Sequence, residues 1–145
     1  NVWLAASFPR HPQQPQAALA LTSSAAAEPL IFCRTVQTSF LRLLTTSALL
    51  RQYGAEGFTN RDAIEVLRTY LALRQVREME EPPGTVALWH QLATCDTASP
   101  KVWMDAYLAA FAISGGLEFV TLNRDFKTYE AHGLRLRLLA PSPTP

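Results

Sequence analysis

The chain has 145 residues, of which 48% are hydrophobic and 17% are charged, and its formal net charge is +1. This length fits one globular domain with a sizeable core, and the near-neutral charge excludes a strongly basic surface that coats nucleic acid, although not a local cationic groove. No apolar run reaches the roughly 18 residues of a membrane span. Cys33 and Cys95 both stand in apolar segments, so we expect two free, buried thiols in a reducing cytoplasm.

In the first half of the chain, apolar residues repeat at helical spacing between short strand-like runs. Residues 1–8 indicate either the exit of a strand or a short helical turn. A capping signal at Thr59 or Asn60 opens one helix, and Gly54 ends another. We expect helices over residues 16–25, 36–54 and 59–74, and strands over residues 29–35 and within residues 75–84.

The second half of the chain continues this alternation of helices and strands. Ser99 is a good N-cap, Pro100 suits the first helical position, and Gly115 and Gly116 end the helix. We expect helices over residues 85–98 and 99–116, strands over residues 117–122 and 134–139, a short turn between these strands, and a disordered tail over residues 141–145.

Asp105 stands in the middle of an otherwise apolar helical segment, residues 102–113. A helix that is apolar on nearly every side is a buried helix. An unpaired buried carboxylate would cost several kcal/mol of folding free energy, so Asp105 must be neutralised, paired or bound to a cation. A salt bridge with Arg34, Arg42 or Lys101 is the simplest alternative to a bound cation.

Strands separated by helices indicate parallel β-α-β units, which predicts an α/β fold with a short parallel β-sheet flanked by more numerous helices. Active sites form at the carboxyl ends of such strands. The strand over residues 117–122 ends directly before Asn123 and Asp125, so we expect these side chains to converge with Asp105 at one sheet edge. Their oxygen atoms suit Mg²⁺ or Mn²⁺. Alternatively, Asp125 only caps the helical turn that follows the strand.

Residues 99–126, SPKVWMDAYLAAFAISGGLEFVTLNRDF, resemble the C-terminal signature of PIN-domain ribonucleases, and of VapC toxins in particular. There, a helix with Asp-Ala-x-Leu-Ala-Ala precedes a strand, followed by Thr-x-Asp and Asp-Phe. NVWLAAS is similar to the end of the opening Asp-x-Asn-x-x-Leu motif, CRTVQTSFLRLLTT to the second-motif helix, and GLRLRLL to the last strand. The resemblance implies one PIN-like domain over residues 1–140, with its N-terminal strand truncated.

The resemblance assigns four catalytic positions. Asp105 matches the metal-binding aspartate of the helix, and Asp125 matches the aspartate of the Asp-Phe pair, which makes these two residues the expected metal ligands. Gln37 falls where many members have a glutamate, and Asn123 where many have the aspartate after the strand. Only two of the four positions therefore carry charge, and we expect this chain to bind divalent metal weakly, since an amide supplies an oxygen without charge.

Three further residues are expected to contact substrate. Asn1 matches the asparagine of the opening motif, whose aspartate would lie two residues upstream. Arg34 and Arg42 bracket Gln37, and one of them would meet an RNA phosphate. A structural salt bridge is the alternative for these arginines.

The function that the resemblance implies is hydrolysis of RNA phosphodiester bonds with Mg²⁺ or Mn²⁺. It also implies a VapB-type antitoxin as partner, a homodimer, and a cytoplasmic location without a membrane. A second hypothesis, favoured by Gln37 and Asn123, is a PIN-like binding or sequestration module that has lost catalysis.

Overall fold

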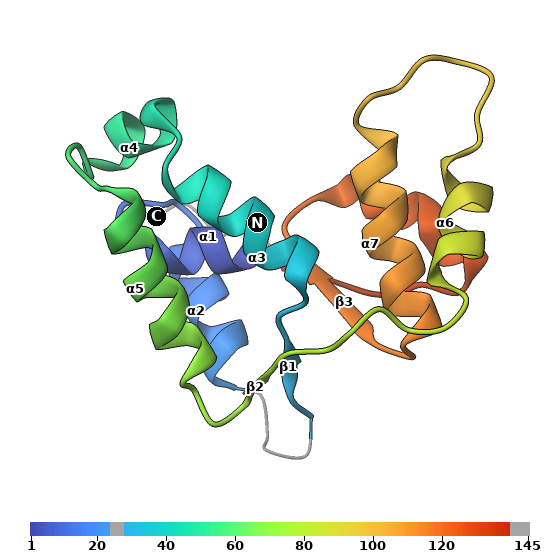
Figure 1. The fold of residues 1–145 in the computed structure, drawn as a ribbon, viewed down its shortest axis with the longest axis horizontal. Helices are drawn as coiled ribbons and strands as arrows, with labels where there is room; N and C mark the ends of the chain where they lie inside the picture. The colour runs from blue at the N-terminus through green and yellow to red at the C-terminus, as the bar shows by residue number, and fades with distance from the viewer. Residues whose placement is uncertain (24–27, 140–145) are drawn as a thin grey trace. The chain divides into compact units, whose positions relative to one another are not determined.

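The computed structural model describes residues 1–23 and 28–139, which form two compact units (Figure 1). We call Asn1–Glu80 the N-terminal unit and Glu81–Leu139 the C-terminal unit. Each unit places its helices around one pair of short parallel strands, which confirms the helix-rich α/β class. Among the described residues the strands form two separate pairs, whereas the sequence suggested one sheet. The expected tail over residues 141–145 lies outside the described ranges.

The N-terminal unit begins with a helix, so the helical alternative for residues 1–8 is the right one. Its strands β1 and β2 pair in parallel, with Leu30 opposite Val76 and Ile31 opposite Arg77. Its elements are α1 (Val2–Ser7), α2 (Gln14–Thr22), β1 (Leu30–Ile31), α3 (Arg34–Leu44), α4 (Ser47–Tyr53), α5 (Asn60–Leu71) and β2 (Val76–Arg77).

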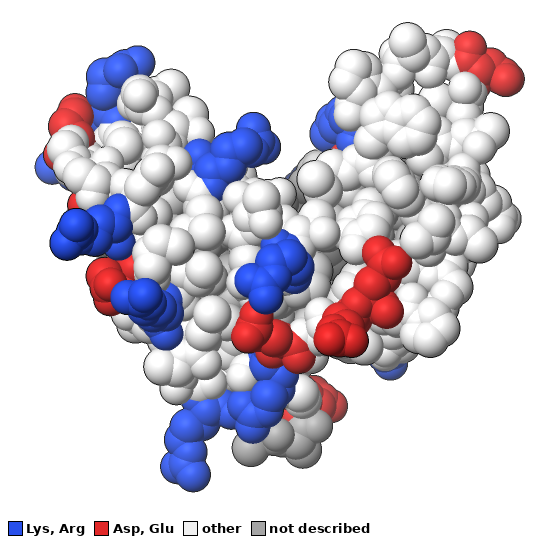
Figure 2. Space-filling view, viewed as in Figure 1, with Lys and Arg blue, Asp and Glu red and all other residues white. Residues whose placement is uncertain are grey.

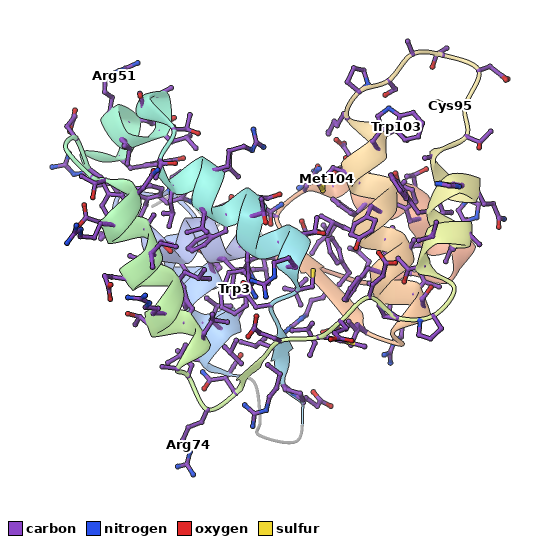
Figure 3. The ribbon with its side chains drawn as sticks, viewed as in Figure 1. Trp3, Arg51, Arg74, Cys95, Trp103 and Met104 are labelled. Atoms are coloured by element: carbon purple, nitrogen blue, oxygen red, sulfur yellow. The ribbon has the colours of Figure 1, made fainter. Side chains whose placement is uncertain are left out.

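Aromatic side chains form the core of the N-terminal unit. Trp3 of α1 stacks on Phe32 with ring centroids 4.2 Å apart and nearly parallel planes, and it lies inside the unit in Figure 3. Phe40 of α3 and Tyr70 of α5 present their ring edges to Phe32. These contacts fix α3 against the end of β1, and they thereby position the side chains on the first turn of α3.

The C-terminal unit contains α6 (Thr85–Ala93), α7 (Val102–Ser114), β3 (Glu118–Thr121), the 3₁₀ helix η1 (Arg124–His132) and β4 (Arg135–Leu138). Strands β3 and β4 pair in parallel from Glu118 opposite Arg135 to Thr121 opposite Leu138. Small residues of α7 (Ala106, Ala109 and Ala112) pack with Phe126 and Tyr129 of η1 in the core. Asp125, the neighbour of Phe126, is therefore anchored beside this core.

Two expectations about burial are wrong in the C-terminal unit. Helix α7 is not buried on every side, because Trp103 is 57% exposed and Met104 is 44% exposed (Figure 3). Helix α6 ends at Ala93, so Cys95 falls in the loop before α7 and is an exposed thiol. Cys33 is free and buried, as expected. Within the described ranges, no helix is both long and apolar enough to cross a membrane.

Candidate functional site

Two aspartates of the C-terminal unit share one cationic partner. Asp105 lies in the first turn of α7, and Asp125 lies in the first turn of η1, just after β3. The Lys101 ammonium lies 4.0 Å from Asp105 Oδ2 and donates a hydrogen bond to Asp125 Oδ2. The structure therefore brings Asp105 and Asp125 together at the carboxyl end of β3, and Lys101 is the partner of Asp105 in place of Arg34 or Arg42.

The start of α7 explains why Lys101 meets Asp105. The helix begins at Val102, with Lys101 as the N-cap residue, and the Asp105 backbone N–H donates to the Lys101 carbonyl oxygen at 3.4 Å. Residues four apart lie on the same face of a helix, which sets the lysine side chain over the aspartate. The sequence suggested a start at Pro100, two residues earlier.

The two carboxylates differ in their surroundings. The Asp105 side chain is only 18% exposed, and burial raises the pKa of its carboxyl group, an effect that Lys101 opposes and Asp125 reinforces. The Asp125 side chain is 60% exposed, and its hydrogen bond from Lys101 lowers the pKa of its carboxyl group. Lys101 therefore compensates Asp125 well and leaves the negative charge of Asp105 partly uncompensated.

Asn123 caps η1 and orients the backbone of Asp125. Its Oδ1 atom accepts a hydrogen bond from the Asp125 backbone N–H at 3.1 Å, and its own backbone N–H donates to Thr121 Oγ1 at 3.1 Å. The alternative in which Asp125 caps this helix is therefore wrong, because the cap is Asn123. The side-chain oxygen of Asn123 is used for the cap, so the Asp125 carboxylate can accept the hydrogen bond from Lys101.

Gln37 lies at the carboxyl end of β1, in the N-terminal unit, and is only 2% exposed. Its Nε2 atom donates to the Phe32 carbonyl oxygen at 2.7 Å and to Glu78 Oε1 at 2.9 Å. Its Oε1 atom accepts from Arg34 at 3.1 Å. Every polar group of this buried amide is thus satisfied, as buried polar groups require. Gln37 thus links α3 to the end of β1 and to Glu78, and its Oε1 atom already accepts a hydrogen bond from Arg34.

Glu78 is a carboxylate that the sequence reasoning missed. It directly follows β2, and its Oε1 atom receives hydrogen bonds from Gln37 and from Arg34, the latter at 3.5 Å. Its side chain is 55% exposed. By itself, the run of Glu78, Glu80 and Glu81 in the sequence is typical of a solvated face or a strand edge. The signal was the position of Glu78 directly after a strand, where functional groups gather in parallel sheets.

Arg34, Arg42 and Asn1 all lie in the N-terminal unit. Arg34 forms a salt bridge with Glu78, as the structural alternative predicts, while most of its side chain stays exposed. Arg42 lies exposed in the last turn of α3 and has no salt bridge among the described residues. Asn1 is the N-cap residue of α1, and its carbonyl oxygen accepts from the Ala5 backbone N–H at 2.9 Å.

The Asp105 and Asp125 pair suits a divalent cation in its chemistry. Both carboxylates already face one positive group, and hard cations such as Mg²⁺ prefer carboxylate oxygens. The set is small, because no group of three or more His, Cys, Asp or Glu residues that could hold a metal occurs among the residues that the structure describes. Asp105 and Asp125 are therefore the residues of the C-terminal unit that would hold a metal.

No protein-family model matches the sequence. The chain is 42% identical over 141 residues to the protein named Ribonuclease VapC41 of Mycobacterium tuberculosis, in strains CDC 1551 / Oshkosh and H37Rv. The matched region covers 97% of this chain and 95% of that relative. The helix-rich α/β fold, with acidic residues after short parallel strands, is thus that of a PIN-like nuclease domain. Within this class, the chain belongs to the VapC family.

Proposed function

We propose that the protein is an endoribonuclease that hydrolyses RNA phosphodiester bonds as the toxin of a toxin–antitoxin pair. The observation that carries this proposal is the 42% identity, over nearly the full length of both chains, with a protein named as a VapC ribonuclease. The convergence of Asp105 and Asp125 on one cationic group supports it, because phosphodiester hydrolysis by such nucleases needs clustered carboxylates.

Asp105 and Asp125 would hold Mg²⁺ or Mn²⁺ in this reaction. A bound divalent cation lowers the pKa of a coordinated water molecule and stabilises negative charge on the phosphoryl group. The fold itself positions the two side chains that would bind the metal. Helix α7 fixes Asp105 beside the apolar core, and Asn123 fixes the backbone of Asp125. The low exposure of Asp105 strengthens its attraction for a cation, since less water screens its charge.

Two arginines of the N-terminal unit would contact the RNA backbone. Figure 2 shows arginine side chains spread over the N-terminal unit on the viewed face, and this unit contains no lysine. The Arg34 side chain is 81% exposed although it pairs with Glu78, and Arg42 is exposed at the end of α3. Guanidinium groups with this exposure suit phosphate recognition. Asn1, at the start of α1, is the third proposed substrate contact.

The second candidate function, a sequestration module without catalysis, has a specific observation in its favour. The side-chain amides of Gln37 and Asn123 form hydrogen bonds within the protein. Their positions therefore contribute no charge to a metal site. RNA binding without cleavage is the result that this alternative predicts.

A VapB-type antitoxin and a second copy of the chain are the proposed protein partners, and the proposed location is the cytoplasm. Exposed apolar side chains on α6 and α7, among them Val86, Trp103 and Met104, support protein contacts. Figure 2 shows that this part of the viewed face is largely uncharged. Light scattering of the isolated chain tests the homodimer, and co-purification with the product of an adjacent small reading frame tests the antitoxin.

RNA cleavage in the presence of Mn²⁺, Mg²⁺ or EDTA tests the proposed function. We expect cleavage with either metal ion and none in EDTA. Asp105→Asn and Asp125→Asn should each reduce cleavage by at least about 100-fold, because each removes half of the charged ligand pair. Asp96→Asn, in the exposed loop before α7, is the matched control and should cleave normally. Metal-independent cleavage, or RNA binding without cleavage, would refute the proposal.

A further inference from the structure

Lys101 occupies the position between the two carboxylates that a divalent cation would need. Its ammonium contacts Oδ2 of Asp105 and Oδ2 of Asp125. Both aspartates raise the pKa of the Lys101 ammonium, so both attract its charge. Among the ion pairs that the described residues of the C-terminal unit form, Lys101 alone contacts two carboxylates. The contact is built into the fold, because Lys101 is the N-cap residue of α7.

A divalent cation and the ammonium compete for the same atoms. The Asp125 Oδ2 atom accepts the hydrogen bond from Lys101, so a metal ion that binds this oxygen must displace the ammonium. A divalent cation and an ammonium held within a few ångströms repel each other, and the repulsion is stronger beside a partly buried group than in bulk water. Such an arrangement favours one cation at a time.

We propose that Lys101 is a positioning residue of the nuclease site, which holds Asp105 and Asp125 together in the metal-free protein and competes with the divalent cation for them. This inference rests on the proposed function, because it takes these aspartates as the metal ligands. It assigns the weak metal binding expected of this chain partly to a built-in competitor, in addition to the small number of charged ligands.

Besides competing with the metal ion, Lys101 holds the two carboxylates close together before any metal binds. Without its ammonium the two carboxylates repel each other, which makes the metal-free protein less stable and the ligand pair less compact. A divalent cation that binds both carboxylates removes this repulsion itself. Removal of the lysine charge therefore raises metal affinity and lowers the stability of the metal-free state, and metal binding recovers the lost stability by mass action.

Lys101→Met tests the proposal, since it keeps the length of the side chain and removes its charge. Isothermal titration calorimetry measures Mn²⁺ affinity, and thermal melts in EDTA and in saturating Mn²⁺ measure stability. We expect Mn²⁺ to bind Lys101→Met about two-fold to five-fold more tightly than wild type, the range that a solvated ion pair allows. The variant should melt at a lower temperature than wild type in EDTA, and Mn²⁺ should narrow this difference.

Two further variants serve as controls. Lys127→Met removes an exposed lysine of η1, two residues beyond Asp125, and should bind Mn²⁺ as wild type does. Lys101→Arg keeps the positive charge and should restore the weaker, wild-type affinity. The Lys101 side chain is 62% exposed, so these replacements leave the core intact, which far-ultraviolet circular dichroism verifies.

The outcomes separate the inference from the proposed function. Equal or weaker Mn²⁺ binding by Lys101→Met, with metal-dependent RNA cleavage by wild type, overturns the role of Lys101 and leaves the nuclease proposal intact. Tight binding by Lys101→Met and weak binding by wild type supports the competition, whether or not RNA is cleaved. If neither protein binds Mn²⁺, the inference and the metal dependence both fail.

Discussion

At the scale of single residues, Asp105 shows how the sequence raised a question that only the structure could answer. A carboxylate in an apolar helix needs a partner, and the sequence offered Arg34, Arg42 and Lys101. The partner is Lys101, which lies four residues earlier. Local spacing made this lysine available, but its second contact, with Asp125, depends on how η1 packs against α7. A tertiary contact of this kind leaves no pattern in the sequence.

The pH dependence of Asp105→Asn follows from the raised pKa of this carboxyl group. A raised pKa in the folded state means that protonated Asp105 favours folding, and that this contribution is lost as pH rises through the folded-state pKa. A neutral Asn keeps the favourable state at every pH. In EDTA, the melting temperature of Asp105→Asn minus that of wild type should therefore increase as the pH is raised from 4 to 7. A relative loss over this range would show that the Lys101 contact outweighs burial.

Gln37 is the residue whose role changed most between sequence and structure. The family resemblance placed it in the catalytic set, whereas its buried amide joins Phe32, Arg34 and Glu78 by hydrogen bonds. Glu78 could not be assigned from sequence, because its contact with Gln37 spans 41 positions of the chain. The sequence singled out this turn of α3 but not Glu78, the side chain that carries the negative charge beside it.

Gln37→Leu should destabilise the protein, because it leaves the buried Phe32 carbonyl and the Gln37 partners without their hydrogen bonds. We expect a loss of about 1–3 kcal/mol in the free energy of unfolding, measured by urea denaturation. Gln91→Leu, on the exposed surface of α6, is the control and should change this free energy by less than about 0.5 kcal/mol. Equal effects of the two substitutions would contradict the structural role of Gln37.

At the scale of elements, the sequence predicted best where a helix end carries a local signal. The start of α5 was expected at Thr59 or Asn60, and Thr59 is the N-cap residue, with Asp62 completing a capping box. The expected single helix over residues 36–54 is instead α3 and α4. No glycine or proline marks this break. There, Thr45 and Thr46 donate side-chain hydrogen bonds to preceding helix carbonyls, and the backbone of Thr46 is extended.

The capping box of α5 gives a prediction at this scale. The Thr59 Oγ1 atom accepts from the Asp62 backbone N–H at 3.3 Å, and Asp62 Oδ2 accepts from the Thr59 backbone N–H at 2.7 Å. Thr59→Ala should lower the free energy of unfolding by about 1 kcal/mol, since one of these bonds is lost. Thr69→Ala, in the last turns of the same helix, should cost less. A stability unchanged by Thr59→Ala would show that tertiary packing alone fixes the start of α5.

At the scale of the whole molecule, the sequence predicted the α/β class and the excess of helix, and both are confirmed. It did not predict that the strands pair two by two. The reason is physical: β1 and β2 each hold two residues, and so short a strand carries no alternation of apolar and polar side chains that could specify its neighbours. The boundary between the compact units carries only a weak signal, because the Pro82, Pro83 and Gly84 that follow it are as typical of a turn as of a linker.

The expectation of one domain over residues 1–140 leads to a prediction about unfolding. A two-stranded pair is marginally stable on its own, and a small unit buries too little of its surface to offset its loss of conformational entropy. We therefore expect neither unit to be stable alone and the chain to unfold in one cooperative transition. Trp3 reports on the N-terminal unit, whereas Trp89 and Trp103 report on the C-terminal unit, where the Trp89 indole donates to the Trp103 carbonyl oxygen.

Two variants make each unit separately visible by tryptophan fluorescence. The double variant Trp89→Phe/Trp103→Phe leaves Trp3 as the reporter, and Trp3→Phe leaves the other two, while phenylalanine keeps an aromatic ring against Phe32. For each variant, the urea unfolding curve from fluorescence should coincide with the curve from far-ultraviolet circular dichroism, because a two-state transition looks the same to every probe. Fluorescence and circular dichroism midpoints that differ within one variant would instead show that the two units unfold separately, and residues 1–140 would then be two domains.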